Sequence, residues 1–360
     1  MSDVAFVRPK PRGERVTLDL RTPICHQLGI DVPIFSVGFG FSAGPELVAA
    51  VSNAGGFGVL WTSMPPEAIG PRVARARELT KRPIGINLII ADLDEPTPLA
   101  EEVAFLDDSV DAALAAEVAM IVFFWGPIDR YVGRAHRSQT KVALQVGSVD
   151  EAKRAATAGA DAIICQGVEA GGHVRGTSSV WQLLPRVVDA VAPVPVLASG
   201  GIGDGAGIAR ALELGAQGVS LGTRFVATDE AFIHPLFKRR VVESRAADTV
   251  HTTVFDINWP DVPHRVLRNR LVREWESAGR PPPGKRPGEG TAIGTLHRPW
   301  GDYAWTRYAT GMVTPDFDGD PDLAPMWAGE SCEVINDIKP AGIVVAELAR
   351  DARAALEVAP

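Results

Sequence analysis

The 360-residue sequence contains few cysteines and no long apolar segment. Cys25, Cys165 and Cys332 are widely spaced and odd in number, which excludes a disulfide framework and a Cys-x-x-Cys zinc site. The longest apolar stretch, residues 118–128, is too short to cross a membrane. We therefore expect reduced thiols and no membrane span. Cys165 lies in a predicted strand, where a core position is favoured over a nucleophilic role.

An excess of basic residues is also missing. The chain has 36 Lys and Arg against 44 Asp and Glu, a net charge of −8, which argues against nucleic acid or an anionic membrane as partner. Residues 1–15 carry charges but no apolar core, so no secretory signal is predicted. No His-x-x-x-His pair or suitably spaced carboxylates indicate a metal site. We expect a cytoplasmic enzyme or small-molecule-binding protein, with homo-oligomerisation left open.

Short apolar runs recur along the first two thirds of the chain, separated by Ala-rich stretches that end in Gly. Continuously apolar runs are typical of parallel strands buried on both faces, and the intervening segments are long enough for crossover helices. Two of these units, 152–167 and 208–223, resemble each other. The pattern predicts a (β/α)8 TIM barrel, with an open doubly wound sheet as the alternative. The eight runs are 33–38, 58–61, 84–90, 120–125, 142–146, 162–166, 194–199 and 218–222.

Local signals mark several helix ends, and the composition changes late in the chain. Ser148 and Ser179 begin predicted capping boxes, while Gly159 and Gly215 are placed to end helices in a left-handed conformation. Five of the eight tryptophans follow residue 250, among many prolines. We expect a barrel core over 1–249, an irregular insertion over the barrel mouth at 250–335, and a closing helix within 336–360. The apolar side of that helix is predicted to carry Ile343, Val344, Leu348 and Leu356.

The active site of such a barrel lies at the carboxyl ends of its strands. The seventh and eighth predicted strands end in Ser199-Gly200-Gly201 and in Ser220-Leu221-Gly222-Thr223. Glycines let backbone N–H groups approach a phosphate, and a helix N-terminus adds a favourable dipole. The alternative is two tight turns that need Gly for positive φ. Because no Gly-Lys-Ser/Thr sequence accompanies the loops, a single phosphate is favoured over a nucleoside triphosphate.

A histidine and three amides complete the predicted site. His173 follows Gly171 and Gly172 after the sixth strand, on a loop rather than on a helix face, and its ordinary pKa suits proton transfer or anion binding. The other six histidines are interpreted as structural. Asn87, Gln145 and Gln166 end the third, fifth and sixth strands. Their donors and acceptors suit a heterocycle such as flavin, although buried amides that cap the barrel interior are an equally good interpretation.

At these residues the sequence resembles the nitronate monooxygenase family, formerly called 2-nitropropane dioxygenases. The matching blocks are ELVAAVSNAGGFG (46–58), GINL (85–88), GADAIICQGVEAGGH (159–173), PVLASGGIGDG (195–205) and GAQGVSLGTRFVAT (215–228). The resemblance implies an FMN-dependent barrel that oxidises alkyl nitronates with O2 to a carbonyl compound and nitrite. It implies FMN at Asn87, Gln166, Gly171, Gly201 and Ser220–Thr223. It makes His173 the catalytic residue that binds a nitronate or deprotonates a nitroalkane.

The resemblance also leaves alternatives. FMN-dependent enoyl-acyl-carrier-protein reductases and NADH:quinone reductases share the fold and the His-bearing loop, but they require reduced nicotinamide. A non-catalytic flavin or phosphate binder would not need His173 for turnover, and a phosphosugar isomerase would be colourless. The expected cofactor-binding residues are Asn87, Gln145, Gln166, Gly171, Gly172, Ser199, Gly200, Gly201, Ser220, Leu221, Gly222 and Thr223.

Overall fold

A computed structural model describes residues 19–360 except 63, 95–96, 299–300 and 359–360. Residues 1–15, for which no secretory signal is predicted, and Trp300 therefore lie outside the described residues. Eight parallel strands form one sheet in the order β1-β9-β8-β6-β5-β4-β3-β2. A bridge between Phe35 and Phe57 brings the two edge strands together, so the sheet closes. The predicted TIM barrel is confirmed. Its strands are β1 (Ile34–Ser36), β2 (Gly58–Trp61), β3 (Ile84–Ile89), β4 (Met120–Phe124), β5 (Lys141–Val146), β6 (Ala162–Gln166), β8 (Val196–Ser199) and β9 (Gly218–Leu221).

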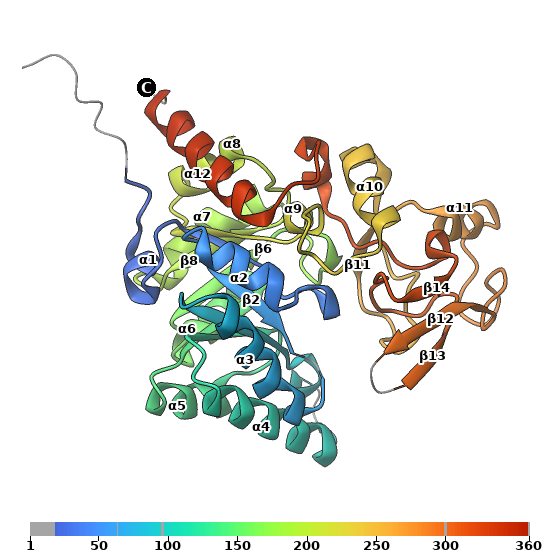
Figure 1. The fold of residues 1–360 in the computed structure, drawn as a ribbon, viewed down its shortest axis with the longest axis horizontal. Helices are drawn as coiled ribbons and strands as arrows, with labels where there is room; N and C mark the ends of the chain where they lie inside the picture. Colours follow the sequence, from blue (N-terminus) through green and yellow to red (C-terminus); the bar gives the residue numbers. More distant parts are fainter. Residues whose placement is uncertain (1–18, 63, 95–96, 299–300, 359–360) are drawn as a thin grey trace, which may run out of the picture.

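Helices surround this barrel (Figure 1). Ser148 and Ser179 accept hydrogen bonds from Glu151 N and Trp181 N at the starts of α6 and α7. Glu151 reaches the amide of Gly147 instead of its own N-cap residue, so the box is incomplete. Gly159 and Gly215 have φ of 95° and 91°, as predicted. The helices that follow the strands are α2 (Pro45–Asn53), α3 (Ile69–Leu79), α4 (Ala100–Ala115), α5 (Asp129–Arg137), α6 (Val149–Thr157), α7 (Val180–Val191), α8 (Gly205–Glu213) and α9 (Thr223–Val226).

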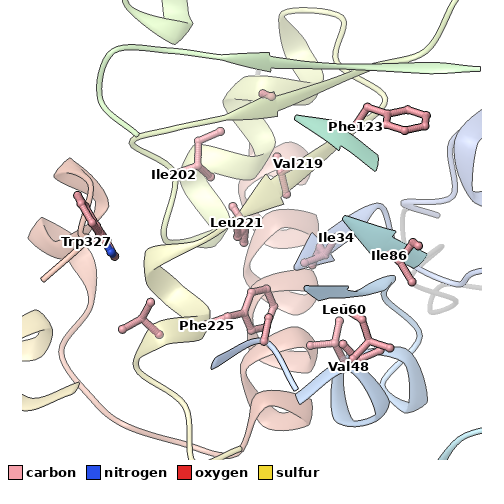
Figure 2. Close-up of a cluster of buried hydrophobic side chains, with 14 of the residues drawn as sticks. Ile34, Val48, Leu60, Ile86, Phe123, Ile202, Val219, Leu221, Phe225 and Trp327 are labelled. Atoms are coloured by element: carbon pink, nitrogen blue, oxygen red, sulfur yellow. The ribbon is translucent and has the colours of Figure 1, made fainter. Parts of the chain in front are cut away.

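Alternate strand residues face two separate cores. Ile34, Leu60 and Phe123 point outward and pack beneath the helices, together with Val48 and Phe225 (Figure 2). Their strand neighbours point inward, where a second cluster fills the barrel above α1 (Pro23–Leu28). This period of two holds even though the runs are continuously apolar, because both faces of the sheet are buried. The inward cluster contains Phe35, Phe57, Val59, Met120, Val122, Ala143, Ala162, Ile164 and Leu197.

Segment 250–335 contains more regular structure than its composition predicts. β11 (His264–Leu267) pairs with β10 (Thr249–Thr252) and with the two-residue β7 (Gly172–His173). A second sheet joins β12 (Ala292–Arg298), β13 (Gly301–Thr306) and β14 (Phe317–Gly319) around its own small core. These strands and α11 (Arg270–Ser277) lie together beside the barrel (Figure 1). We call residues 254–331 the lid.

The last helix, α12 (Ala341–Val358), packs against α8 and α2 and so completes the ring of helices. Val344 and Leu348 are buried, as predicted, and Leu356 packs partly against the core. Ile343 was assigned to the same apolar side, but it is 50% exposed. Successive helix residues are about 100° apart, so turning Val344 and Val345 toward α8 and α2 leaves Ile343 facing outward.

Candidate active site

A cavity of about 750 Å³ lies at the carboxyl ends of the barrel strands and is roofed by the lid. Its walls are mainly apolar and include Trp61, Phe124, Trp259 and Trp327. All twelve expected cofactor-binding residues and His173 border this cavity. The structure therefore brings together residues spread over more than 130 positions of sequence, which is the general geometry of an enzyme site in this fold.

The polar floor of the cavity follows from the alternation along the strands. Counting by two from the inward residues Ala143, Ile164 and Leu197 leads to three polar residues, Gln145, Gln166 and Ser199. Counting by two from the strand glycines Gly85 and Gly218 leads to Asn87 and Ser220. The five polar side chains, in the order Asn87, Gln145, Gln166, Ser199 and Ser220, are each at most 6% exposed. The register places the last three side by side, since Gln166 pairs with Ser199 and Ser199 with Ser220. The barrel thus changes from apolar to polar one layer below its mouth.

Several buried polar atoms at this floor have no partner among the described residues. They are Gln145 Nε2, Gln166 Oε1 and His173 Nε2. Gln166 Nε2 donates to the carbonyl of His173 at 3.1 Å, and Asn87 Nδ2 donates to that of Val122 at 3.0 Å, so both amides are held in position. A buried polar atom without a hydrogen bond costs about 1–3 kcal/mol. A ligand with both donors and acceptors would relieve this cost.

His173 lies in β7, opposite His264 of β11, rather than on the bare loop that its glycine neighbours predicted. Antiparallel pairing with the lid fixes its backbone. Its ring packs against Trp259 and Trp327, with centroids 4.4 and 5.1 Å away. Burial lowers the pKa of His173 to about 3, with a smaller contribution from His264. The imidazole is therefore neutral at physiological pH, and its residue borders the cavity, while its buried Nε2 atom has no partner among the described residues.

His264 was interpreted as an ordinary structural histidine, but it belongs to the surroundings of His173. Its ring is fully buried, with its centroid 5.8 Å from that of His173. Its Nδ1 lies 2.9 Å from the carbonyl of Val262, and its Nε2 accepts the amide of Phe255 at 3.3 Å. Burial lowers its pKa to about 4. No local sequence signal identifies this residue, because its position depends on strand pairing across 91 residues.

The two glycine loops border the cavity with unused backbone donors. Gly200 and Gly201 have φ of 101° and 71°. Within the described part of the chain, their amides and those of Gly222 and Thr223 have no hydrogen-bond acceptor. The N-terminus of α8, in contrast, is already capped by Asp204, which accepts from Gly207 N at 2.8 Å. A phosphate here would depend on the loop amides and not on the dipole of α8.

Three of the expected residues contribute differently from the rest. The side chain of Leu221 packs in the outer core, so its backbone is the part available to a ligand. A Cβ on Gly171 would lie 2.4 Å from Gly329 N, so this glycine permits the lid to close against the β6 loop. The hydroxyl of Thr223 accepts the same Gly329 amide at 2.9 Å. Gly171 and Thr223 therefore also help to join the barrel and the lid.

The lid supplies functional candidates that sequence reasoning missed. Arg298 is the only charged side chain among the described residues that line the cavity. Its guanidinium pairs with Asp316 at 2.5 Å and lies over the ring of Phe41. Trp259 and Trp327 enclose His173. The many tryptophans after residue 250 indicated an apolar cover, but only the folded lid shows which two of them face His173.

Three further expectations concern a cysteine nucleophile, a metal site and a membrane-spanning helix. Cys165 is buried in the outer core, and burial raises the pKa of its thiol to about 12, which disfavours a nucleophilic thiolate. Among the residues that the structure describes, no group of three or more His, Cys, Asp or Glu side chains could hold a metal ion. No helix within those residues combines the length and apolarity needed to cross a membrane.

Comparison with known proteins identifies the class of protein to which this barrel belongs, which is the oxidoreductases. The nitronate monooxygenase family model matches residues 21–351, and the chain belongs to that family.

The individual relatives and solved structures that resemble this chain are named for different enzyme activities. The chain is 36% identical over 264 residues to a "(3aS,4S,5R,7aS)-5-hydroxy-7a-methyl-1-oxo-octahydro-1H-indene-4-carboxyl-CoA dehydrogenase" of Mycobacterium tuberculosis, covering 72% of this chain and 70% of that protein. It is 31% identical to a probable nitronate monooxygenase of Staphylococcus saprophyticus, with coverages of 71% and 81%. FabK from Thermotoga maritima aligns with a TM-score of 0.73 at 28% identity, covering 94% and 97% of the two chains. A nitroalkane oxidase from Streptomyces ansochromogenes aligns with a TM-score of 0.70 at 29% identity, covering 92% and 98%.

Proposed function

We propose that this protein is an FMN-dependent oxidase of alkyl nitronates and nitroalkanes, which uses O2 and yields a carbonyl compound and nitrite. The observation that carries the proposal is the neutral, unpaired Nε2 of His173 at a cavity whose floor has unsatisfied amides and whose rim has free glycine N–H groups. Family membership and the alignment with a nitroalkane oxidase support the same reaction class.

The residues present fit FMN. Gln145 Nε2 and Gln166 Oε1 supply an unpaired donor and acceptor for the alternating N–H and C=O edge of a flavin ring. The amides of Gly200, Gly201, Gly222 and Thr223 would hold its phosphate, with Ser199 and Ser220 between ring and phosphate sites. Asn87 and the backbone at Gly171, Gly172 and Leu221 border the same space. When bound, FMN supplies the electron-transfer chemistry that no side chain of this site can provide.

His173 is proposed as the base that removes a proton from the carbon next to the nitro group. Because its pKa is about 3, the imidazole is unprotonated at neutral pH and cannot attract an anion through charge, but it is also a weak base. Of the two roles that the family resemblance implies, the unprotonated ring is compatible with deprotonation, whereas nitronate binding through charge would need a protonated ring. Arg298 is the cation on the cavity wall that could stabilise a nitro or nitronate group. Trp259 and Trp327 exclude water from the reacting carbon.

The decisive experiment mixes the FMN-loaded protein anaerobically with ethyl nitronate, nitroethane, NADH or NADPH and follows flavin absorbance. Bleaching by the nitro compounds alone, with nitrite formed after oxygen is admitted, is the expected result. Bleaching by NADH or NADPH without any response to nitro compounds would contradict the proposal. A purified protein without bound or bindable flavin would also contradict it.

The second candidate is a reductase that takes electrons from NADH or NADPH, in the manner of an enoyl-acyl-carrier-protein reductase or a quinone reductase. The alignment with FabK over 94% of this chain favours it. Relatives named as carboxyl-CoA dehydrogenases add acyl thioesters to the substrates worth testing. The same anaerobic assay separates the two candidates, because only the reductase consumes reduced nicotinamide.

A further inference from the structure

A second hollow adjoins the active-site cavity. It has a volume of about 470 Å³ and lies between the end of β3 and the first turns of α4. Leu88, Ile89, Phe105 and Leu106 give it apolar walls. Phe105 is 41% exposed, although α4 has buried positions available for large apolar residues. We call this hollow the α4 groove.

The α4 groove and the active-site cavity share three bordering residues, Ile89, Asn258 and Trp259. The two spaces are therefore adjacent, and the indole of Trp259 forms part of the wall of both. That indole also packs near the ring of His173, at 4.4 Å between centroids. A ligand that passes Trp259 would thus reach from the reacting histidine into the groove.

The charges around the α4 groove restrict what it can hold. Its only charged lining residues within the described chain are Glu101 and Glu102. Glu102 Oε2 accepts the amide of Leu99 at 3.3 Å, which keeps that carboxylate at the start of α4. Two carboxylates repel an anionic tail, whereas the apolar walls favour hydrocarbon. A neutral aliphatic chain or ring is the chemical class that meets both conditions.

We propose that the α4 groove binds the neutral apolar tail of the substrate whose head reacts at His173, and that Trp259 and Phe105 determine the preferred tail length. The inference rests on the proposed function, because it assigns the remainder of the same substrate. It applies equally to an unbranched nitroalkane and to the acyl part of a thioester. The tail site predicts an enzyme that prefers substrates with long apolar tails, whereas the active-site cavity alone would accept substrates with the shortest tails.

The test compares 1-nitroalkanes from nitroethane to nitrooctane in the wild-type and Phe105→Asp proteins. Burial of a methylene contributes about 0.8 kcal/mol, so kcat/KM is expected to rise about fourfold for each methylene that enters the groove. Phe105→Asp should lower kcat/KM for nitrooctane at least about tenfold while nitroethane is turned over as before. Ala104→Asp is the matched control, because it adds the same charge at the adjacent, exposed position of α4 outside the groove.

A binding measurement keeps the inference separate from the reaction. The neutral fluorescent probe N-phenyl-1-naphthylamine should bind the wild-type holoprotein and be displaced by 1-octanol, and Phe105→Asp but not Ala104→Asp should weaken it. Displaceable binding with no nitroalkane turnover would contradict the proposed function and leave the tail site supported. A kcat/KM that does not depend on chain length, or equal effects of the two Asp substitutions on the probe, would overturn the tail site.

Discussion

His173 and His264 illustrate how burial selects a protonation state. The ring of His173 packs against Trp259 and Trp327, and the ring of His264 against Phe255 and Trp327, so both imidazoles are largely withdrawn from water. Desolvation is the main reason that their pKa values fall to about 3 and about 4. His264 also uses Nε2 to accept an amide, and protonation at that atom would break the hydrogen bond. The pair is therefore built to remain neutral.

Replacing His173 tests its assignment as the base. His173→Gln removes the basic nitrogen but keeps a polar side chain of similar reach, so turnover of nitroethane should fall about 10²- to 10⁴-fold. FMN affinity, measured by fluorescence titration, should stay within about threefold. In the wild type, kcat/KM should show no acid limb near pH 6.5, because the pKa of His173 is about 3. Unchanged turnover in the variant would show that His173 is not the base and has only a structural role.

His264 should make stability depend on pH. Its pKa is about 4 in the folded chain and about 6.5 in the unfolded chain, so between these values the unfolded state binds more protons. The free energy of unfolding should therefore fall as the pH drops from 6.5 to 4, by at most about 3 kcal/mol from this residue. Urea unfolding at several pH values should show a shallower dependence for His264→Asn. Parallel curves for the two proteins would exclude the linkage.

At the level of single elements, the strands were predictable because their apolar runs are short and regularly spaced. β2 and β6 begin and end at the predicted residues, and the others differ by one or two residues. Alternation also explains why Gln145 and Gln166 face inward. The pairing of β7 with β11 was not predictable, since Gly172 and His173 form only two residues of strand and their partner lies in a segment without clear periodicity. Such pairing depends on tertiary structure.

The loop after β8 offers a test at this scale. Gly201→Ala places a side chain at φ 71°, where its Cβ would lie 3.1 Å from Glu169 Cβ beside the proposed phosphate site. Gly279→Ala places one at φ 83° with no atom within 4 Å. Both substitutions should cost about 1 kcal/mol in backbone strain. Only Gly201→Ala should also weaken FMN binding, by tenfold or more in a fluorescence titration. Equal FMN affinity in both variants would argue against this placement of the phosphate.

For the whole molecule, the sequence predicted a barrel with a cover but not how the cover completes the site. The matching blocks end near residue 228, and Arg298, Trp259 and His264 all follow them. Their roles depend on where 254–331 folds back over the mouth. The division at residues 249 and 335 stays a proposal, because β10 spans the first boundary and pairs with β11, which in turn pairs with β7 of the barrel. Only a packed structure reveals the α4 groove beside the cavity.

The small core of the lid gives the last prediction. Ile293, Trp305, Val313 and Phe317 form a cluster separate from both barrel cores, whereas other lid residues such as Leu271 belong to the outer core. The β12–β14 sheet should therefore be able to open while the barrel stays folded. Phe317→Ala removes a ring that is 6% exposed and should destabilise this cluster by about 3–5 kcal/mol. Hydrogen exchange should accelerate in 292–319 while β3–β6 keep their protection, and nitronate turnover should fall. Ile343→Ala, at a half-exposed site on α12, is the control and should change neither. If the barrel strands lose protection together with the β12–β14 sheet, the two parts unfold as one unit and the sheet cannot open independently to admit substrate.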